Sequence, residues 1–345
     1  MATVDLETIV KYAWLAYDSS REIIKITDIS AKVSTNFVFR VKFRDKGFVI
    51  AKLSYFGKFE HFSEDHQIIQ ALGNNLPIPF DNFLAKSLMK NDKLYIHRFT
   101  NDSIDAWVIF YQPIKIKQKL PRILEIPDIV NLGKEFANFH KTCNLIRNTL
   151  PKSTKTLESD IRDFTHYLHT EDGIEEFGEN APTILKHCDQ FLTNFKPLKS
   201  ALLPIIPVFV DWNIGNFSIS AGRFYSRWDY DWFRVSTRMM DFYFIARVVS
   251  AVGDRTLFTY NIEPLKDPRF VIFLKEYHQI NPLKREEILF IKEAYRFFLI
   301  NYVLRHGQYF FRTDYVHQLQ KDVLDTHLDA IDSFDPQFIL DALSL

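Results

Sequence analysis

The sequence predicts an α+β protein with two lobes: a small, mostly antiparallel β lobe with one helix, then a larger, mostly helical lobe. Two observations support this. Up to about residue 114 the chain consists of β-branched and aromatic runs separated by turns, and from about residue 125 apolar residues recur at three- and four-residue steps. An extended connection at 111–117 separates the two patterns. We therefore place the lobes at residues 1–112 and 113–345.

The small lobe is predicted to contain several short strands and one long helix. The helix is expected at 58–72, where the apolar residues follow a helical period that ends at Gly73. The strands are expected at 23–30, 36–43, 48–56, 83–89, 93–99 and 106–114.

The large lobe is predicted to be helical on both sides of one extended hairpin. The hairpin is expected to pair 205–211 with 217–220 and to continue through 223–231. The helices are expected at 129–146, 156–170, 182–195, 239–253, 270–278, 285–307 and 315–331.

The overall composition excludes some classes of function. Lys+Arg and Asp+Glu both number 43, so no net charge attracts nucleic acid or an anionic membrane, and neither partner is expected. The longest apolar run, 201–210, contains two prolines and is too short to span a membrane. Cys143 and Cys188 lack metal-ligand spacing and are expected to be buried thiols. We expect a soluble, cytoplasmic protein.

Glycine is scarce, with only ten in the chain. No two of them form a GxG motif, so neither a Walker A loop nor a dinucleotide-binding fingerprint is present. Any phosphate-binding loop must depend less on glycine.

An acidic stretch within the hairpin, VFVDWNIGN at 208–216, is the main candidate for a functional site. Asp211 and Asn216 bracket a tight excursion in which Gly215 can take a positive φ. Asp229 lies on the next extended run and can fold back opposite Asn216. Two carboxylates and an amide oxygen suit Mg²⁺. The alternative is that Asp211 and Asn216 only cap a turn.

The order and spacing of Asp211, Asn216, Asp229 and Asp241 resemble the aminoglycoside phosphotransferase and choline kinase family, which has a protein-kinase-like fold. The resemblance implies that Asp211 orients the substrate hydroxyl or accepts its proton, and that Asn216 and Asp229 hold Mg²⁺. It also implies that Asp241 braces the catalytic loop. The activity it implies is transfer of the γ-phosphoryl group of ATP to a hydroxyl group.

The same resemblance assigns ATP-binding roles in the small lobe, which becomes the nucleotide-binding lobe. Lys52 would reach the α- and β-phosphates, with a carboxylate partner at Glu64 or Asp65. The remaining nucleotide contacts would come from a phosphate loop at Ser34, Thr35 and Asn36, and from backbone groups of the hinge between the lobes near Tyr111 and Gln112.

Two departures from the family pattern leave an alternative open. Phe209 and Val210 stand where the family has His and Gly, and no glycine occurs between Met1 and Lys46. A catalytically weak or inactive pseudokinase that acts as a scaffold is therefore the competing interpretation. A Ser/Thr protein kinase ranks lower, because the chain lacks an Ala-Pro-Glu segment.

The acceptor is expected to be a small molecule with a hydroxyl group, such as an amino-alcohol, an aminoglycoside or a sugar-like compound. Asp231 could attract an amine, and Trp232 could belong to an aromatic cage. Core packing is the more common role of such a ring. His140 is expected to be a core residue.

Overall fold

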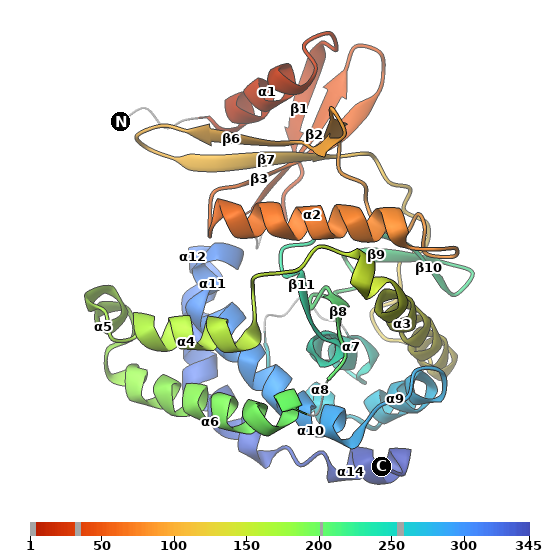
Figure 1. Cartoon of the computed structure of the whole chain (residues 1–345), viewed down its shortest axis with the longest axis vertical. Helices are drawn as coiled ribbons and strands as arrows, with labels where there is room; N and C mark the ends of the chain where they lie inside the picture. Colours follow the sequence, from red (N-terminus) through yellow and green to blue (C-terminus); the bar gives the residue numbers. More distant parts are fainter. Residues whose placement is uncertain (1–4, 32–35, 201–202, 254–258) are drawn as a thin grey trace.

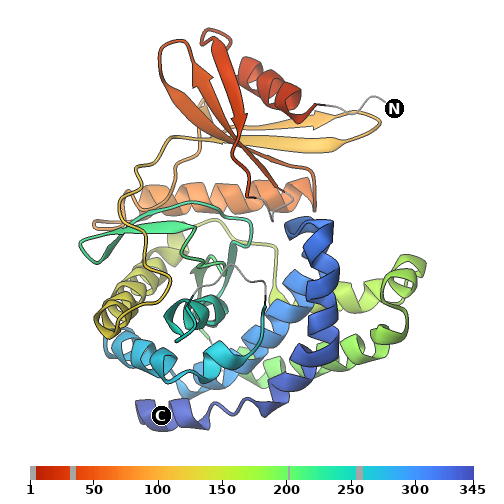
Figure 2. The ribbon, with the colours of Figure 1, turned by 180° about the vertical axis from the view of Figure 1, so that it is seen from behind.

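The computed structural model describes residues 5–31, 36–200, 203–253 and 259–345, with the side chains of 199 and 200 excluded. A small lobe built on a sheet lies above a larger helical lobe, and α2 (Phe59–Asn75) lies between them (Figure 1). Seen from behind, residues 112–125 run down one side of the molecule from β7 to α3 (Figure 2). The boundary after residue 112 falls in this connection and stays a prediction.

The small lobe contains one antiparallel five-stranded sheet, which confirms the predicted β character. In spatial order its strands are β1 (Ile23–Asp28), β2 (Phe37–Phe43), β3 (Phe48–Ser54), β7 (Asp105–Tyr111) and β6 (Ile96–Thr100). The short strands β4 (Met89–Lys90) and β5 (Lys93–Leu94) pair with each other. The prediction of a strand at 83–89 is therefore mostly wrong, because residues 83–88 make only isolated bridges, at Leu84 and Ser87, and the strand begins at Met89.

One face of the sheet is covered by a helix that we did not predict, α1 (Leu6–Tyr17). Alternate strand residues such as Val41, Ala51 and Val108 pack with Val10 and Trp14 of this helix in a separate core. The prediction of one helix in the small lobe is wrong on this count. Because side chains alternate across a strand, Lys52 belongs to the opposite face, toward the large lobe.

The predicted helix at 58–72 is α2, and it runs past Gly73 to Asn75. Its apolar residues Ile68, Ile69 and Leu72 belong to the core of the large lobe rather than to the core under α1. The helix thus couples the sheet to the large lobe.

The large lobe is mostly helical, as predicted. Its α-helices are α3 (Ile126–Ile146), α4 (Leu157–Tyr167), α5 (Glu171–Phe177), α6 (Ala181–Ser200), α7 (Phe242–Val249), α8 (Glu263–Lys266), α9 (Pro268–Ile280), α10 (Arg285–Phe297), α11 (Gly307–Phe310), α12 (Thr313–Asp322), α13 (Leu328–Ala330) and α14 (Gln337–Leu343). Its other helical turns are the 3₁₀ segments η1 (Arg147–Thr149), η2 (Gly178–Asn180), η3 (Arg238–Asp241) and η6 (Ile331–Ser333), and the π segments η4 (Phe298–Arg305) and η5 (Val323–His327).

Gly133 allows α3 and α9 to pack closely. A Cβ atom at this position would lie 2.8 Å from the carbonyl oxygen of Phe273, so any larger residue would force the helices apart.

Two short ribbons carry the acidic stretch, and their pairing differs from the prediction. β8 (Ile205–Val208) pairs with β11 (Arg234–Thr237), and β9 (Phe217–Ser220) pairs with β10 (Arg223–Arg227). The predicted pairing of 205–211 with 217–220 is therefore wrong. Residues 209–216 form a loop too long for a tight hairpin turn, which leaves β8 to pair with a later strand.

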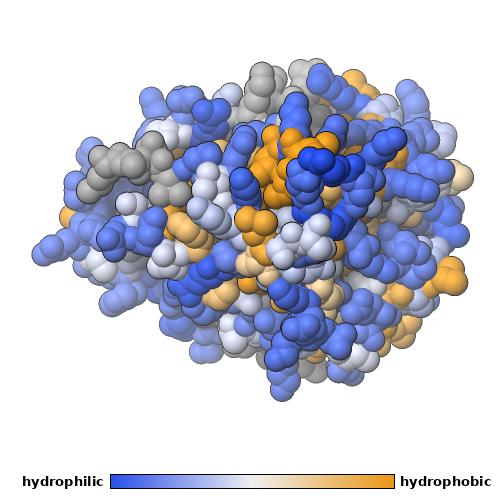
Figure 3. Space-filling view, turned by 90° about the horizontal axis from the view of Figure 1, so that it is seen from above, coloured by the Kyte–Doolittle hydropathy of each residue, from blue (hydrophilic) through white to orange (hydrophobic). Residues whose placement is uncertain are grey.

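The surface at the small-lobe end is mostly hydrophilic, with a compact hydrophobic patch (Figure 3). Among the described residues, no helix combines the length and the apolar character needed to cross a bilayer.

Candidate active site

The loop between β8 and β9 holds Asp211 in a defined position. Its Oδ2 accepts a hydrogen bond from Nδ2 of Asn216 at 2.8 Å, and its Oδ1 accepts from the backbone N–H of Asn213 at 3.2 Å. The two residues that the sequence placed together are thus in contact. Gly215 does not use its freedom to take a positive φ, and the loop takes one at Val210 instead, where φ is 61°.

Val210 is a costly residue for that conformation, because a β-branched side chain clashes with its own backbone at positive φ. Asp241 compensates. Its Oδ1 accepts hydrogen bonds from the backbone N–H groups of Phe209 at 2.9 Å and Val210 at 2.6 Å. Its Oδ2 lies 2.9 Å from Nε2 of His140, and both side chains are fully buried. Asp241 braces the loop as expected, and His140 is a core residue.

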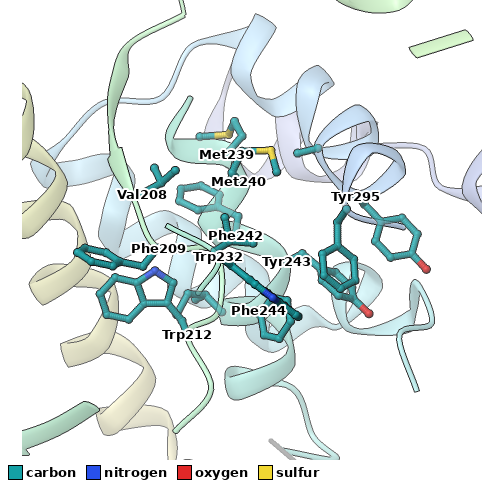
Figure 4. Close-up of a cluster of buried hydrophobic side chains, with 14 of the residues drawn as sticks. Val208, Phe209, Trp212, Trp232, Met239, Met240, Phe242, Tyr243, Phe244 and Tyr295 are labelled. Carbon is teal, nitrogen blue, oxygen red and sulfur yellow. The ribbon is translucent and has the colours of Figure 1, made fainter. Parts of the chain in front are cut away.

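Arg227, at the end of β10, was missed by the sequence analysis. It is completely buried, and its Nη2 donates to the carbonyl oxygen of Asp211 at 2.9 Å. Its guanidinium lies 4.4 Å from the ring centre of Phe209 and 4.2 Å from that of Trp212. These two rings lie side by side in Figure 4. A lone arginine in a strand carries no sequence signal for this role.

Asp229 lies beside the Asp211 loop. The backbone N–H of Trp228 donates to the carbonyl oxygen of Asn216 at 3.0 Å, and Asp229 follows with a φ of 66° and a side chain that is 40% exposed. Within the described residues, no three His, Cys, Asp or Glu side chains gather closely enough to hold a metal ion. A magnesium site here would need the amide oxygen of Asn216 beside the carboxylates, and that donor set suits a hard cation.

Lys52 reaches this acidic segment from the sheet. Its Nζ lies 3.1 Å from Oδ1 of Asp229 and also forms an ion pair with Asp231. Burial alone would lower the pKa of Lys52, but the two carboxylates raise it above its usual value. Burial would likewise raise the pKa of Asp229, yet the Lys52 ammonium lowers it. Lys52 is therefore held as a cation.

The phosphate-loop residues can be placed only in part. Nδ2 of Asn36 donates to Oδ2 of Asp231 at 2.8 Å, which ties the start of β2 to the acidic segment. Ser34 and Thr35 lie outside the described residues.

The predicted carboxylate partner of Lys52 is wrong, because both candidates on α2 bind elsewhere. Glu64 accepts hydrogen bonds from the Ser153 hydroxyl at 2.7 Å and from the backbone N–H and hydroxyl of Thr154 at 2.9 and 2.7 Å. Asp65 pairs with Nζ of Lys155 at 2.5 Å. Residues 153–155 thus hold both carboxylates, and Lys52 turns to the acidic segment instead.

The predicted hinge residues have other contacts as well. The Tyr111 hydroxyl lies 2.7 Å from Nε2 of His66, and both side chains are buried. The backbone N–H of Gln112 donates to the carbonyl oxygen of Lys86 at 2.9 Å. The side chain of Tyr111 and the N–H of Gln112 are therefore already engaged.

The predicted acceptor residues differ in what surrounds them. Trp232 is 6% exposed and packs against the ring of Phe244 (Figure 4). It also contacts the ring of Tyr302, so core packing accounts for it. Asp231 is partly exposed, but it already pairs with Lys52, which it shares with Asp229. Burial raises the pKa of Asp231 although Lys52 opposes the shift.

Comparisons with known proteins identify the fold. No protein-family model matches the chain, and no curated protein matches it. Solved structures do match. An amicoumacin kinase, in complex with AMP-PNP, Ca²⁺ and its ligand, has a TM-score of 0.62 at 14% identity and covers 97% of each chain.

Two other matches point in the same direction. Choline kinase from Streptococcus pneumoniae has a TM-score of 0.58 at 13% identity, covering 95% of this chain and 99% of the other. A microcompartment-associated aminopropanol kinase has a TM-score of 0.57 at 11% identity, covering 97% and 98%. The chain therefore has the two-lobed fold of these small-molecule kinases, as the resemblance in its sequence implied.

Proposed function

We propose that the protein transfers the γ-phosphoryl group of ATP to the hydroxyl group of a small molecule. The observation that carries this proposal is the meeting of Lys52, from the small lobe, with the segment of the large lobe that holds Asp211, Asn216 and Asp229. This donor set matches the needs of phosphoryl transfer, which depends on positioning and charge stabilisation more than on covalent chemistry. The nucleotide analogue in the amicoumacin kinase structure supports ATP as the donor.

Each residue has a distinct role in this proposal. Lys52 binds phosphate oxygens, and Asp211 orients the acceptor hydroxyl and takes its proton. Asn216 and Asp229 would hold Mg²⁺, which supplies charge neutralisation when bound. Because Lys52 and Asp229 contact each other, nucleotide binding must replace their ion pair with contacts to phosphate.

The acceptor we propose is a small alcohol, because the structural neighbours include kinases of amicoumacin, aminopropanol and choline. A panel of amino-alcohols, aminoglycosides and simple sugars, assayed for ADP release with MgATP, tests this. We expect acceptor-dependent turnover in the wild type and none in Asp211→Asn, with nucleotide affinity unchanged. Asp189→Asn, on the exposed face of α6, is the matched control. Equal turnover in Asp211→Asn would contradict its assigned role.

A second candidate is a pseudokinase, and two observations favour it: the strained Val210 and the direct pairing of Lys52 with Asp229. Thermal unfolding with ATP separates the two, measured with and without Mg²⁺. Ligand at a hundred times Kd should stabilise an enzyme by about 2.7 kcal/mol. The enzyme interpretation requires a magnesium-dependent shift that weakens in Asp229→Asn. If ATP does not shift the unfolding temperature under any condition, the protein is a scaffold rather than an enzyme.

A further inference from the structure

The large lobe contains a cavity away from the loop that carries Asp211. Its volume is about 580 Å³, which falls within the range of small-molecule sites. It is lined by the segment between α3 and α4, by β8 and β11, and by Phe195 of α6. No residue of 209–216 lines it. In Figure 1 the segment between α3 and α4 runs below α2 and in front of β8 and β11.

The walls of the cavity are apolar and its charged groups are mostly cationic. The apolar lining includes Leu150, Leu157, Phe195, Leu203, Ile205 and Val235. Ile205 leaves 48% of its surface exposed, although it belongs to a strand. An exposed apolar lining of this kind favours a ligand with an apolar body.

The charge of the lining favours an anion. Arg147, Lys152 and Lys155 line the cavity beside a single carboxylate, Glu158, which pairs with Arg162. Lys155 pairs with Asp65, but no carboxylate among the described residues pairs with Arg147 or Lys152. An organic anion with an apolar body would complement both features.

The cavity shares residues with the contact that holds α2. Ser153 and Lys155 line the cavity, and the same side chains bind Glu64 and Asp65 of α2. Ile205 and Pro207 of β8 also line the cavity, and β8 leads directly into the Asp211 loop. A ligand in the cavity would therefore touch the supports of both the nucleotide lobe and the candidate catalytic loop.

We propose that this cavity is a second ligand site, for a small organic anion with a largely apolar body, and that its occupancy is coupled to nucleotide binding. The coupling rests on the proposed function, whereas the site itself does not. The physical basis is competition at Lys155. An anion bound at Lys155 weakens the ion pair between Lys155 and Asp65 of α2. Because α2 packs between the large lobe and the sheet, a shift of this helix reaches the strand that carries Lys52.

The test uses 8-anilinonaphthalene-1-sulfonate, an apolar sulfonate, titrated by fluorescence and calorimetry. We expect one molecule bound per chain. Lys152→Glu and Ile205→Asp each place a carboxylate at an exposed position of the cavity and should weaken binding about tenfold. Lys141→Glu on α3 and Ile174→Asp on α5 make the same changes at exposed positions outside the cavity, and should bind like the wild type.

Binding that is equally strong in cavity and control variants would overturn the site. A titration with ADP and Mg²⁺ tests the coupling. If the two sites are linked, the affinity for the probe changes and reaches a plateau at saturating ADP. Displacement that continues to zero would place the probe in the nucleotide cleft and overturn the site, and an unchanged affinity with ADP bound would overturn the coupling. If the protein binds no ADP, the proposed function fails. The cavity and control variants still show whether the probe binds in the cavity.

Discussion

The guanidinium of Arg227 donates a hydrogen bond to the main-chain carbonyl of Asp211 at 2.9 Å and packs against the rings of Phe209 and Trp212. This contact joins the loop that carries Asp211 to the strand that leads into Asp229. A planar guanidinium can stack and donate at the same time, which an ammonium cannot. Arg227 thus supports the loop where Phe209 and Val210 depart from the family pattern.

We predict that Arg227→Met lowers turnover by about 10²-fold, because loss of the contact lets Asp211 shift from the acceptor hydroxyl. The free energy of unfolding should fall by about 1–3 kcal/mol, since the variant leaves the carbonyl oxygen of Asp211 without its hydrogen-bond donor. Arg227→Lys keeps the charge but loses the stacking, so it should restore only part of the activity. Steady-state kinetics and thermal unfolding check this, and unchanged kcat in Arg227→Met would contradict it.

We predict that Lys52→Met weakens binding of ADP and Mg²⁺ about tenfold or more, because it removes a buried cation placed to meet phosphate oxygens. Isothermal titration calorimetry measures the affinity directly. Lys42→Met, on the exposed side of β2, removes the same charge from the same lobe and is the control. If both variants bind ADP like the wild type, Lys52 does not contact the nucleotide.

The strain at Val210 gives a prediction about stability. Replacing a buried valine by glycine normally costs the burial of its side chain, but at position 210 glycine also removes about 1–2 kcal/mol of backbone strain. Val210→Gly should therefore destabilise the protein by about 1–2 kcal/mol less than Val208→Gly, which removes an equally buried valine from β8. Chemical denaturation of both variants measures the difference. Equal losses would mean that the Val210 backbone is not strained.

Asp65 gives a prediction about pH. Burial raises the pKa of its carboxyl to about 6, although Lys155 opposes the shift. The unfolded-state pKa is about 3.9, so between pH 4 and 6 the folded state binds more protons than the unfolded state. The stability contributed by Asp65 therefore falls as the pH rises through this range.

Asp65→Asn removes this proton binding. As the pH rises from 4 to 6, the free energy of unfolding of the variant minus that of the wild type should increase by about 2–3 kcal/mol. Unfolding curves at several pH values measure that difference, and Asp189→Asn, an exposed carboxylate on α6, serves as the control. A wild-type-minus-variant difference that stays constant with pH would show that Asp65 titrates normally.

The sequence by itself determined the two-lobed architecture and the acidic stretch. Hydrophobic periodicity separated the β lobe from the helical lobe, because a period of two and a period of 3.6 reflect local backbone geometry. The contact between Asp211 and Asn216 could also be predicted, since these residues are five apart on one loop. The approach of Asp229 followed from its place on the next extended run, and its role as a magnesium ligand stays a prediction.

Only the tertiary structure decided which partner each charged side chain takes. Lys52 pairs with Asp229 and Asp231 rather than with α2, and Asp65 pairs with Lys155, ninety residues later in the chain. These pairings depend on how helices and strands distant in sequence pack, and no local pattern encodes them. The same holds for Arg227. Its contact with the Asp211 carbonyl depends on how β10 packs against a loop that Asp241 also holds.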